Sequence, residues 1–468
     1  MAFYAVKRPV GEEVEQPYIL GRLKLRIPFV HYPFEFPDAI QGAILSVVPM
    51  GAIAAMNQAL GIPFEIAIGM VIVNNFLYLI HTHFGDPVVA GWITPGIPLY
   101  IAFVTSFAEG VARIHAMIAL QAMIGIIFLV LGVTGLAKWV VDRVPVSMKA
   151  GIVLGAGFAS ILAEFSAKGR VSQFPVTILF GVLSAYFMLF SQTTNELRKK
   201  IPAFRYIAQY GIAVPFAIAY ALGIAIGEVQ APQITWNLVP VKWGDTWRML
   251  SPFVIGWPPL SYYIQAFPLA FAAYIIAFGD VLLADSLFKT ADAARPDEKV
   301  IYEPNRNHII CAIRNLFECV WMPYLPLAGP QWVGGQALVI NRYMNSTRQQ
   351  EESYWGGATS IFWGMSIALC LGPIVSLFKP GVAVGLSLTV LIQGFLCCYV
   401  GMEMVSTTIE RGVAGIIGAV IAGRGAAWGL AIGVALYLLV EYAWVKPKVA
   451  SAARASSQEA SGSSASGD

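Results

Sequence analysis

The chain carries few charged residues for its length. Only 12% of its 468 residues are Asp, Glu, Lys or Arg and 57% are hydrophobic, whereas roughly 25% of an ordinary soluble domain is charged. Water is therefore not its main solvent. Apolar runs of about 20 residues recur, and each is long enough to cross a hydrocarbon core of about 30 Å as a helix. The runs do not alternate in polarity, which argues against a membrane β-barrel.

Cysteine and histidine are also scarce, with five of each in the chain. No CxxC pair occurs, so the cysteines are interpreted as packing residues of apolar segments. His81, His83 and His115 are not spaced as metal ligands and are interpreted as loop or interface residues. We therefore predict no metal and no cofactor beyond a coupling proton or sodium ion.

Motifs for chemistry on nucleotides or esters are missing. There is no nucleotide-cradling loop, nucleophile elbow or HExxH motif, so neither ATP-driven transport nor membrane hydrolysis is supported. We predict that the protein is not an enzyme and binds no nucleic acid. The first 35 residues contain charges and prolines but no apolar core, so a cleavable signal peptide is not expected.

Fourteen apolar segments are predicted to cross the membrane as helices. They cover residues 37–60, 63–80, 88–107, 114–133, 146–162, 175–190 and 207–226 in the first half, and 267–288, 308–327, 331–344, 360–378, 381–400, 402–422 and 426–442 in the second. Lys and Arg gather in alternate connections, as expected for an integral protein of the cytoplasmic membrane with both termini inside.

The two halves resemble each other. Segment one opens with Phe36-Pro37-Asp38-Ala39 and segment eight with Phe267-Pro268-Leu269-Ala270. Seven segments separate these two starts, and an odd number of crossings forces the second half to insert upside down relative to the first. The sequence therefore predicts the inverted repeat of many secondary transporters.

Segments three and ten are both interrupted. Gly85-Asp86-Pro87 precedes Trp92-Ile93-Thr94-Pro95-Gly96, and Gly329-Pro330 precedes Trp332-Val333-Gly334-Gly335. We interpret both as half-helices that follow extended backbone, which is tolerated at membrane depth where it lines a cavity or is buried in protein. Their N-termini would meet near the midplane and present free N–H groups and partial positive charge. Kinks in two ordinary helices are the alternative.

Asp280 lies near the middle of segment eight. A carboxylate inside a membrane costs several kcal/mol unless it is paired, hydrated or protonated, so it predicts a coupling or substrate group, with a structural hydrogen bond as the alternative. Asp285 is interpreted as interfacial. Pro49 occupies the corresponding position of segment one, where it frees a carbonyl for a ligand or only kinks the helix.

The remaining candidates surround the two breaks. Trp92 and Trp332 could wall a pocket, and Gln331 and Gln336 could orient a solute or instead cap the half-helix. Pairs of Glu164, Glu318, Glu403 or Glu410 with Arg314 or Arg411 could act in gating. The predicted substrate-binding residues are Asp280, Pro49, Trp92, Thr94, Gly96, Gln331, Trp332, Gly334, Gly335 and Gln336, and Asp280 is also the predicted ion-coupling residue.

These features together resemble the superfamily of nucleobase and ascorbate transporters, sulfate permeases and bicarbonate exchangers. The run from Ala90 to Gly96 is also similar to a run of bacterial benzoate transporters. The resemblance implies a core domain of segments one to four and eight to eleven, which moves against a gate domain of the others, and a homodimer through the gate. Asp280 matches a glutamate of the nucleobase branch by position, but no acid matches that branch's second one near Gln331.

The implied domains follow these segments. A cytoplasmic segment (1–35) precedes the first section of the core (36–133) and the first section of the gate (134–230). After an extracytoplasmic loop (231–262) come the second section of the core (263–378), the second section of the gate (379–444) and a disordered tail (445–468). The predicted fold is an all-α polytopic membrane protein, a 7+7 inverted repeat with half-helices in segments three and ten.

The predicted function is proton- or sodium-coupled symport of a small anion, inorganic or carboxylate, by an elevator-like movement. Two converging helix N-termini beside one titratable acid favour this interpretation. A nucleobase-like symporter, an uncoupled anion channel, and a scaffold or sensor without transport remain as alternatives.

Overall fold

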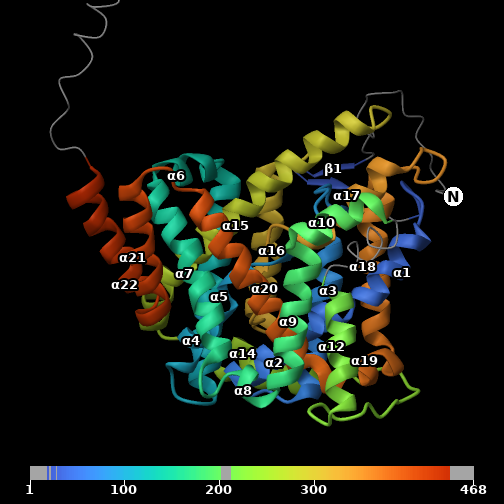
Figure 1. Cartoon of the computed structure of the whole chain (residues 1–468), viewed down its shortest axis with the longest axis horizontal. Helices are drawn as coiled ribbons and strands as arrows, with labels where there is room; N and C mark the ends of the chain where they lie inside the picture. The colour runs from blue at the N-terminus through green and yellow to red at the C-terminus, as the bar shows by residue number, and fades with distance from the viewer. Residues whose placement is uncertain (1–17, 21–22, 28, 202–211, 443–468) are drawn as a thin grey trace, which may run out of the picture.

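The structure is a computed structural model that describes residues 18–20, 23–27, 29–201 and 212–442 (Figure 1). Its first half contains β1 (Tyr18–Leu20), β2 (Leu23–Leu25), α1 (Phe36–Leu45), α2 (Val47–Leu60), α3 (Phe64–His83), β3 (Gly91–Trp92), the 3-10 turn η1 (Thr94–Gly96), α4 (Ile97–Thr105), α5 (Val111–Thr134), α6 (Ala137–Arg143), α7 (Val146–Phe165), α8 (Arg170–Gln173), α9 (Pro175–Phe190), α10 (Gln192–Lys200) and α12 (Ala213–Ala225).

The second half begins with two short helices. They are α13 (Trp243–Leu250) and α14 (Pro252–Ile255), followed by α15 (Leu260–Ala294), α16 (Pro304–Trp321), β4 (Ala328–Gly329), α17 (Val333–Asn345), α18 (Tyr354–Cys370), α19 (Gly372–Phe378), the 3-10 turn η2 (Lys379–Gly381), α20 (Val382–Glu403), α21 (Thr408–Arg424), α22 (Ala426–Leu436) and the π-turn η3 (Tyr437–Glu441).

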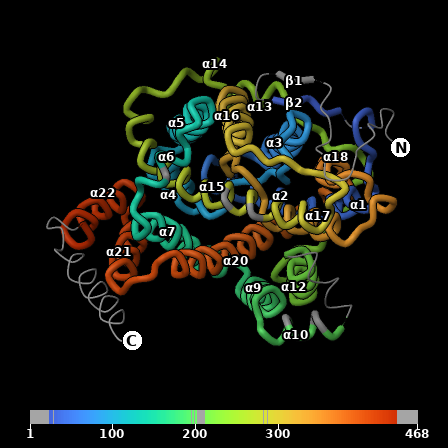
Figure 2. Tube along the Cα trace, turned by 90° about the horizontal axis from the view of Figure 1, so that it is seen from above, coloured from blue at the N-terminus to red at the C-terminus, as the bar shows by residue number. Residues whose placement is uncertain are grey.

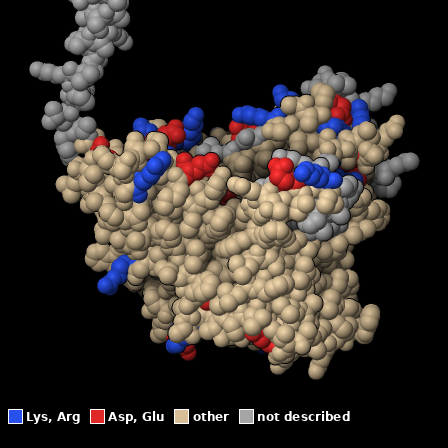
Figure 3. Space-filling model, in the orientation of Figure 1, with Lys and Arg blue, Asp and Glu red and all other residues tan. Residues whose placement is uncertain are grey.

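The all-α prediction is confirmed, and each of the fourteen predicted segments overlaps a described helix. Within the described residues, six helical stretches are long and apolar enough to cross a membrane by length and composition. On the face of the molecule seen in Figure 3, charged side chains gather mainly at one end, above a wide band of uncharged residues. The start of segment seven, some of the N-terminal segment and the tail lie outside the described residues.

Segment eight differs from its prediction. Its helix α15 begins at Leu260, so Phe267 and Pro268 lie inside it and do not open it. In segment one, Phe36 and Pro37 do start α1, because a proline in the first turn loses no helical hydrogen bond. The shared F-P-x-A motif therefore marks different points of the two helices, and its interpretation as a common helix start is wrong.

Segment one is broken at the predicted proline. Helix α1 ends at Leu45 and α2 starts at Val47, with Ser46 between them. Pro49 has no N–H to donate to the carbonyl of Leu45, four residues earlier, and its ring crowds that carbonyl. Pro49 and the Ser46 hydroxyl are buried, and the hydroxyl has no hydrogen-bond partner among the described residues.

The helices form two groups (Figure 2). Helices α1, α2, α3, α5, α15, α16, α17 and α18 lie together on one side, and α7, α9, α12, α20, α21 and α22 lie along the other. Helix α5 packs on α15 and α16, whereas α20 and α21 pack on α7. The strongest contact between the groups joins α2 to α20. The grouping follows the predicted core and gate, whose boundaries stay predictions.

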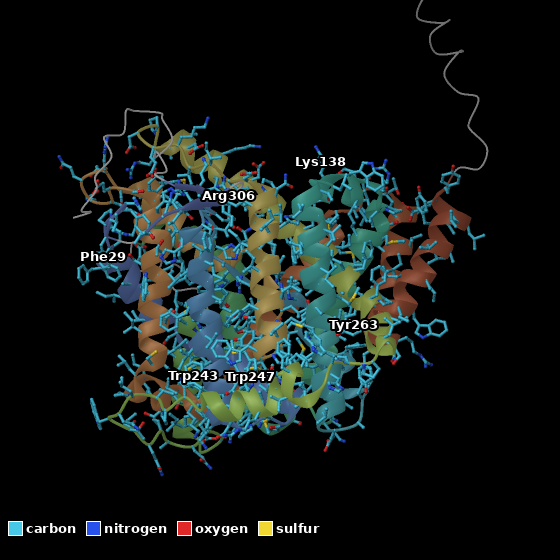
Figure 4. All side chains as sticks on the ribbon, turned by 180° about the vertical axis from the view of Figure 1, so that it is seen from behind. Phe29, Lys138, Trp243, Trp247, Tyr263 and Arg306 are labelled. Atoms are coloured by element: carbon cyan, nitrogen blue, oxygen red, sulfur yellow. The ribbon has the colours of Figure 1, made fainter. Side chains whose placement is uncertain are left out.

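The connection between the two halves crosses one end of the molecule. Figure 4 shows Trp243 and Trp247 on α13, which lies across the ends of the long helices, and Arg306 and Lys138 toward the opposite end. This segment is tied to the break between α18 and α19, where Val239 N donates to Cys370 O (2.9 Å) and Gly372 N to Asn237 O (2.7 Å). The tie fixes the connection to the end of the bundle.

Candidate functional site

Two short strands from opposite halves of the chain pair at the centre of the site. Gly91 pairs with Gly329 and Trp92 with Ala328, in antiparallel register. Next to them, Ile93 N donates to Leu327 O (2.9 Å). The extended backbone predicted at both breaks is therefore present, and its buried polar groups are largely satisfied by the other strand.

Each strand leads into a short helix. Strand β3 continues through η1 into α4, and β4 is followed by α17, whose N-cap is Trp332. The pairing of the strands places both helix N-termini at one junction, and the two helices then run toward opposite ends of the molecule (Figure 1). The predicted half-helices in segments three and ten are confirmed. Unbonded N–H groups at such N-termini attract anions.

Glycine allows the strands to approach this closely. A Cβ atom at Gly91 would lie 2.6 Å from the backbone nitrogen of Trp332, and one at Gly329 would lie 2.7 Å from the carbonyl carbon of Trp92. Real Cβ atoms essentially never come this close to backbone. The junction therefore requires glycine at both positions.

Side chains of α16 hold the strands from one side. Asn315 binds both backbone groups of Ala328: its Nδ2 donates to the carbonyl (2.9 Å) and its Oδ1 accepts from the N–H (3.1 Å). Arg314 donates to the carbonyls of Gly91 and Gly329, both at 3.3 Å. Arg314 therefore bonds to backbone and does not form the carboxylate pair considered from the sequence.

The prediction that His81 is a loop or interface residue is wrong. His81 is fully buried in the last turn of α3, where its Nδ1 lies 2.6 Å from Asp86 Oδ2 and its Nε2 lies 3.2 Å from Arg314 Nη1. The spacing of the histidines along the chain bears only on metal binding. No signal in the sequence pairs His81 with Arg314, which lies 233 positions away. His115 does lie at a partly exposed loop contact, with Nε2 2.9 Å from Gly256 O.

Glu318 lies one turn beyond Arg314 and is also fully buried. Gln121 Nε2 donates to its Oε2 (2.8 Å), and Asn74, oriented with its amide nitrogen toward Glu318, donates to Oε1 at 2.9 Å. In that orientation the Asn74 oxygen accepts from Trp92 Nε1 (3.1 Å). The indole of Trp92 is thus held by this network on the buried side of the strand.

Asp280 lies on α15, which packs against both η1 and α17. It is surrounded by protein yet remains partly exposed, as does Gly279 beside it, and within the described residues no group donates a hydrogen bond to its carboxylate. Its electrostatic neighbours include Cys311 of α16 and Cys397 of α20. The predicted coupling acid is therefore an unpaired carboxylate between the two helix groups.

The two glutamines differ in their surroundings. Gln336 Oε1 accepts from Val89 N (2.6 Å) and its Nε2 donates to Tyr354 Oη (2.5 Å), so this amide binds α17 to the lead-in of β3. Gln331 is 1% exposed, and neither its amide nitrogen nor its oxygen has a partner in the described part of the chain. Of the two predicted glutamines, Gln331 is therefore the one whose amide has no partner among the described residues.

The other predicted residues surround the helix starts. Trp332 and Thr94 are partly exposed, Gly334 is exposed, and Gly96 and Gly335 are buried against neighbouring rings, Tyr100 and Trp332 respectively. Pro49 is buried on α2, which packs against α4 and α20. A cavity of about 580 Å³ opens elsewhere, beside Glu109, Arg113 and Arg248, and none of the predicted site residues lines it.

An ion cluster fixes the far end of α17. Arg342 pairs with Asp38 of α1, with Glu35 Oε2 (Nη2 to oxygen, 3.1 Å) and with Glu351 Oε2 (Nη1 to oxygen, 3.6 Å). Three carboxylates therefore share this guanidinium. Burial raises the pKa of Glu351 to about 7 although Arg342 lowers it, and Glu35 adds to the rise.

We expect this carboxylate to make stability depend on pH. The folded state holds the proton more tightly than the unfolded chain, so stability should fall as pH rises from about 4.5 to 7, by at most about 3 kcal/mol. Glu351→Gln should therefore raise the melting temperature in detergent more at pH 8 than at pH 5, with Glu352→Gln as the matched control. An equal shift at both pH values would contradict the assignment.

Solved structures with the same arrangement were found by comparison. The transmembrane domain of a cyanobacterium bicarbonate transporter, BicA, aligns with a TM-score of 0.52 and 15% identity over 85% of this chain and 96% of that chain. SLC26A9 aligns with a TM-score of 0.53 and 14% identity over 87% of this chain, which spans 65% of the SLC26A9 chain. Searches with protein-family models and among curated proteins return no match.

At these identities the likeness establishes the fold. It agrees with the inverted repeat, the interrupted segments three and ten, and the resemblance stated from the sequence. The chain is an integral membrane protein with the fold of BicA and SLC26A9.

Proposed function

We propose that the protein is a secondary transporter that moves a small anion, inorganic or carboxylate, together with a proton or sodium ion. The observation that carries the proposal is the pairing of β3 with β4, which brings the N-termini of α4 and α17 to one junction. Each helix N-terminus carries about half a positive charge, and the first turn of α17 also presents unbonded N–H groups. At the start of α4 the dipole is the main contribution, because Pro95 and Pro98 have no N–H and the N–H groups of Gly96 and Ile97 bond to Ile93 O and Thr94 O. BicA, which has the same fold, is a bicarbonate transporter.

Asp280 is the proposed coupling residue. A carboxylate deep in a membrane protein is costly when it is charged and unpaired, and a bound proton or sodium ion removes that cost. With the cation bound, Asp280 no longer repels an anion at the nearby helix N-termini. Cation and anion therefore favour each other's binding, which is the condition for symport.

During transport, the junction of β3 and β4 would move relative to the second group of helices, α7, α9, α12, α20, α21 and α22. Arg314 and Asn315 of α16 bind β3 and β4, and Gln336 of α17 binds the lead-in of β3, so these elements would move as one body. Helices α7, α20 and α21 would form the opposing gate, through which two copies would pair. In this proposal the protein works in the cytoplasmic membrane without catalysing a chemical reaction.

The Asp280 proposal predicts a selective loss of coupling. Asp280→Asn in proteoliposomes should lower anion uptake driven by a proton or sodium gradient by at least about tenfold, a change of about 1.4 kcal/mol. Asp285→Asn is the matched control on the same helix, because Asp285 is 46% exposed and pairs with Lys289 (2.6 Å). Its uptake should stay within about twofold of wild type, as expected for a surface pair.

Several outcomes would contradict the proposal. Wild-type uptake that ignores both gradients, or Asp280→Asn uptake equal to wild type, excludes the coupling role. Conductance in planar bilayers far above carrier turnover would identify an uncoupled channel.

A neutral solute of the nucleobase type is the second candidate. The buried amide of Gln331 supports it, because it has a free donor and a free acceptor beside the helix start. Thermal-shift screening of bicarbonate, sulfate and benzoate against uracil and xanthine separates the two candidates. Stabilisation by uracil or xanthine alone would favour the second.

A further inference from the structure

We propose that Arg314 of α16 is a positioning residue that sets the placement of the two half-helices, and thereby the affinity of the anion site in the function proposed above. Its Nη2 donates to Gly91 O and its Nη1 to Gly329 O, both at 3.3 Å. Gly91 and Gly329 are direct partners in the two strands. One planar group thus binds both strands at the same point of their register.

The chemistry of the side chain suits this role. A guanidinium presents several donors in a fixed fork, whereas a lysine ammonium is a point charge on a flexible stem. Arg314 is fully buried and its guanidinium carbon lies 4.7 Å from the centre of the Tyr78 ring, so its position is restricted. Both strand carbonyls belong to the glycines that let the two strands approach closely.

Stability alone does not account for the arrangement. Among the described residues no carboxylate lies within ion-pair distance of Arg314. Glu318, one turn along α16, is an electrostatic neighbour of Arg314, but its hydrogen bonds go to Gln121 and Asn74. A buried charge is costly without a counter-ion, and an apolar side chain of similar size is often at least as stabilising. Carbonyl dipoles offset part of the cost here. The remaining positive charge lies directly beneath the junction where the anion is proposed to bind.

His81 helps to fix the position of the Arg314 guanidinium. Because Arg314 can only donate, His81 Nε2 must accept, so the imidazole proton lies on Nδ1 and faces Asp86 Oδ2 at 2.6 Å. Asp86 also accepts from Asn307 Nδ2 (2.8 Å), which donates in turn to Pro330 O (3.1 Å). The same set of contacts therefore reaches the lead-in of β3 and the residue that directly follows β4.

Hydrogen–deuterium exchange combined with uptake kinetics tests the proposal. In Arg314→Lys and Arg314→Met we expect backbone exchange in residues 89–93 and 327–332 to rise together, and KM for the transported anion to rise by about tenfold or more. Arg306→Lys is the control: Arg306 lies on the same helix and donates to Gly85 O, outside the paired strands. It should leave KM and the exchange of both strands unchanged.

The outcomes separate positioning from charge and from stability. Wild-type exchange and KM in Arg314→Lys would show that positive charge suffices and would overturn the proposal. A lower melting temperature with unchanged KM would show that Arg314 only stabilises the fold, and this result would also overturn the proposal. If wild-type protein transports no anion, the proposed function fails, while the exchange measurement still decides whether Arg314 holds the strands.

A second pair of variants applies if Arg314 variants do not fold. In His81→Gln the amide oxygen can accept from Arg314 while its nitrogen donates to Asp86, whereas His81→Phe can do neither. The proposal expects near wild-type KM and strand exchange for His81→Gln and increases in both for His81→Phe. Equal behaviour of the two variants would overturn it.

Discussion

Gly91→Ala and Gly329→Ala are each expected to abolish anion uptake and to lower the melting temperature of the protein. The added methyl group would lie 2.6 Å from the backbone nitrogen of Trp332 in the first variant and 2.7 Å from the carbonyl carbon of Trp92 in the second. Backbone cannot rotate away as a side chain can, so the strands must separate. Overpacking of this kind costs about 1–3 kcal/mol, occasionally more.

The loss of function should exceed the loss of stability. Separating the strands moves the two helix N-termini apart and lengthens the bonds from Arg314 to the carbonyls of both glycines. An anion bound between the N-termini would then lose donors on one side. We therefore expect uptake below about a tenth of wild type even in protein that remains folded, since about 1.4 kcal/mol of lost binding is already tenfold.

Gly415→Ala provides the matched control. This glycine lies in α21, and a Cβ atom there would have no other atom within 4 Å, apart from its chain neighbours and its own helix backbone. Uptake and melting temperature should match wild type or improve slightly, because alanine favours helix over glycine by about 1 kcal/mol. Wild-type uptake in Gly91→Ala would contradict the role assigned to the junction.

The interrupted segments could be predicted because glycine and proline act locally. A proline inside a helix removes a backbone hydrogen bond whatever its neighbours are, so Pro49, Pro87 and Pro330 predicted breaks in the apolar segments. The meeting of the two breaks followed from the inverted repeat, since corresponding segments of the two halves converge. The strand pairing of Gly91 with Gly329 agrees with both inferences.

The support behind the junction could not be predicted in the same way. Arg314 contacts His81 and Gly91, which are more than 200 positions away, and the hydrogen bonds of Arg314 and Asn315 go largely to backbone carbonyls. Every residue has a backbone carbonyl, so the sequence does not show which carbonyl a side chain will bind. Burial of Arg314 was foreseeable from its apolar neighbours, but its partners depend on which backbone the fold brings beside it.

The second half of the repeat shows a related limit. Phe267 and Pro268 matched a helix start in composition, yet α15 extends back to Leu260 because a membrane helix can tolerate an internal proline when neighbours satisfy the freed carbonyl. A repeated motif therefore indicates the repeat of the two halves more reliably than it indicates the residue at which a helix begins. The helix instead begins directly after Pro258 and Pro259, with Pro259 as its N-cap residue.

Gly364→Ala and Gly42→Ala are expected to be the most destabilising single substitutions among the spanning helices. α1 and α18 cross at these residues: a Cβ at Gly42 would collide with the carbonyl oxygen of Ile361, and one at Gly364 with that of Ala39. Small residues let membrane helices approach to backbone contact, and the packing energy of the pair depends on that approach. Either methyl group must push the helices apart, at a cost toward the upper end of the about 1–3 kcal/mol that overpacking usually causes.

The displacement should also reach the binding site. Helix α1 carries Asp38, which pairs with Arg342 at the far end of α17, and Glu35 next to α1 pairs with the same guanidinium. Moving α1 away from α18 would open this ion cluster and release the end of α17 opposite the junction. We therefore expect lower melting temperatures together with a raised KM, measured against Gly412→Ala, whose Cβ would meet nothing within 4 Å beyond its own helix and chain neighbours. A variant at Gly364 as stable as wild type would show that the two helices can separate without cost, and that the cluster at Arg342 does not depend on their contact.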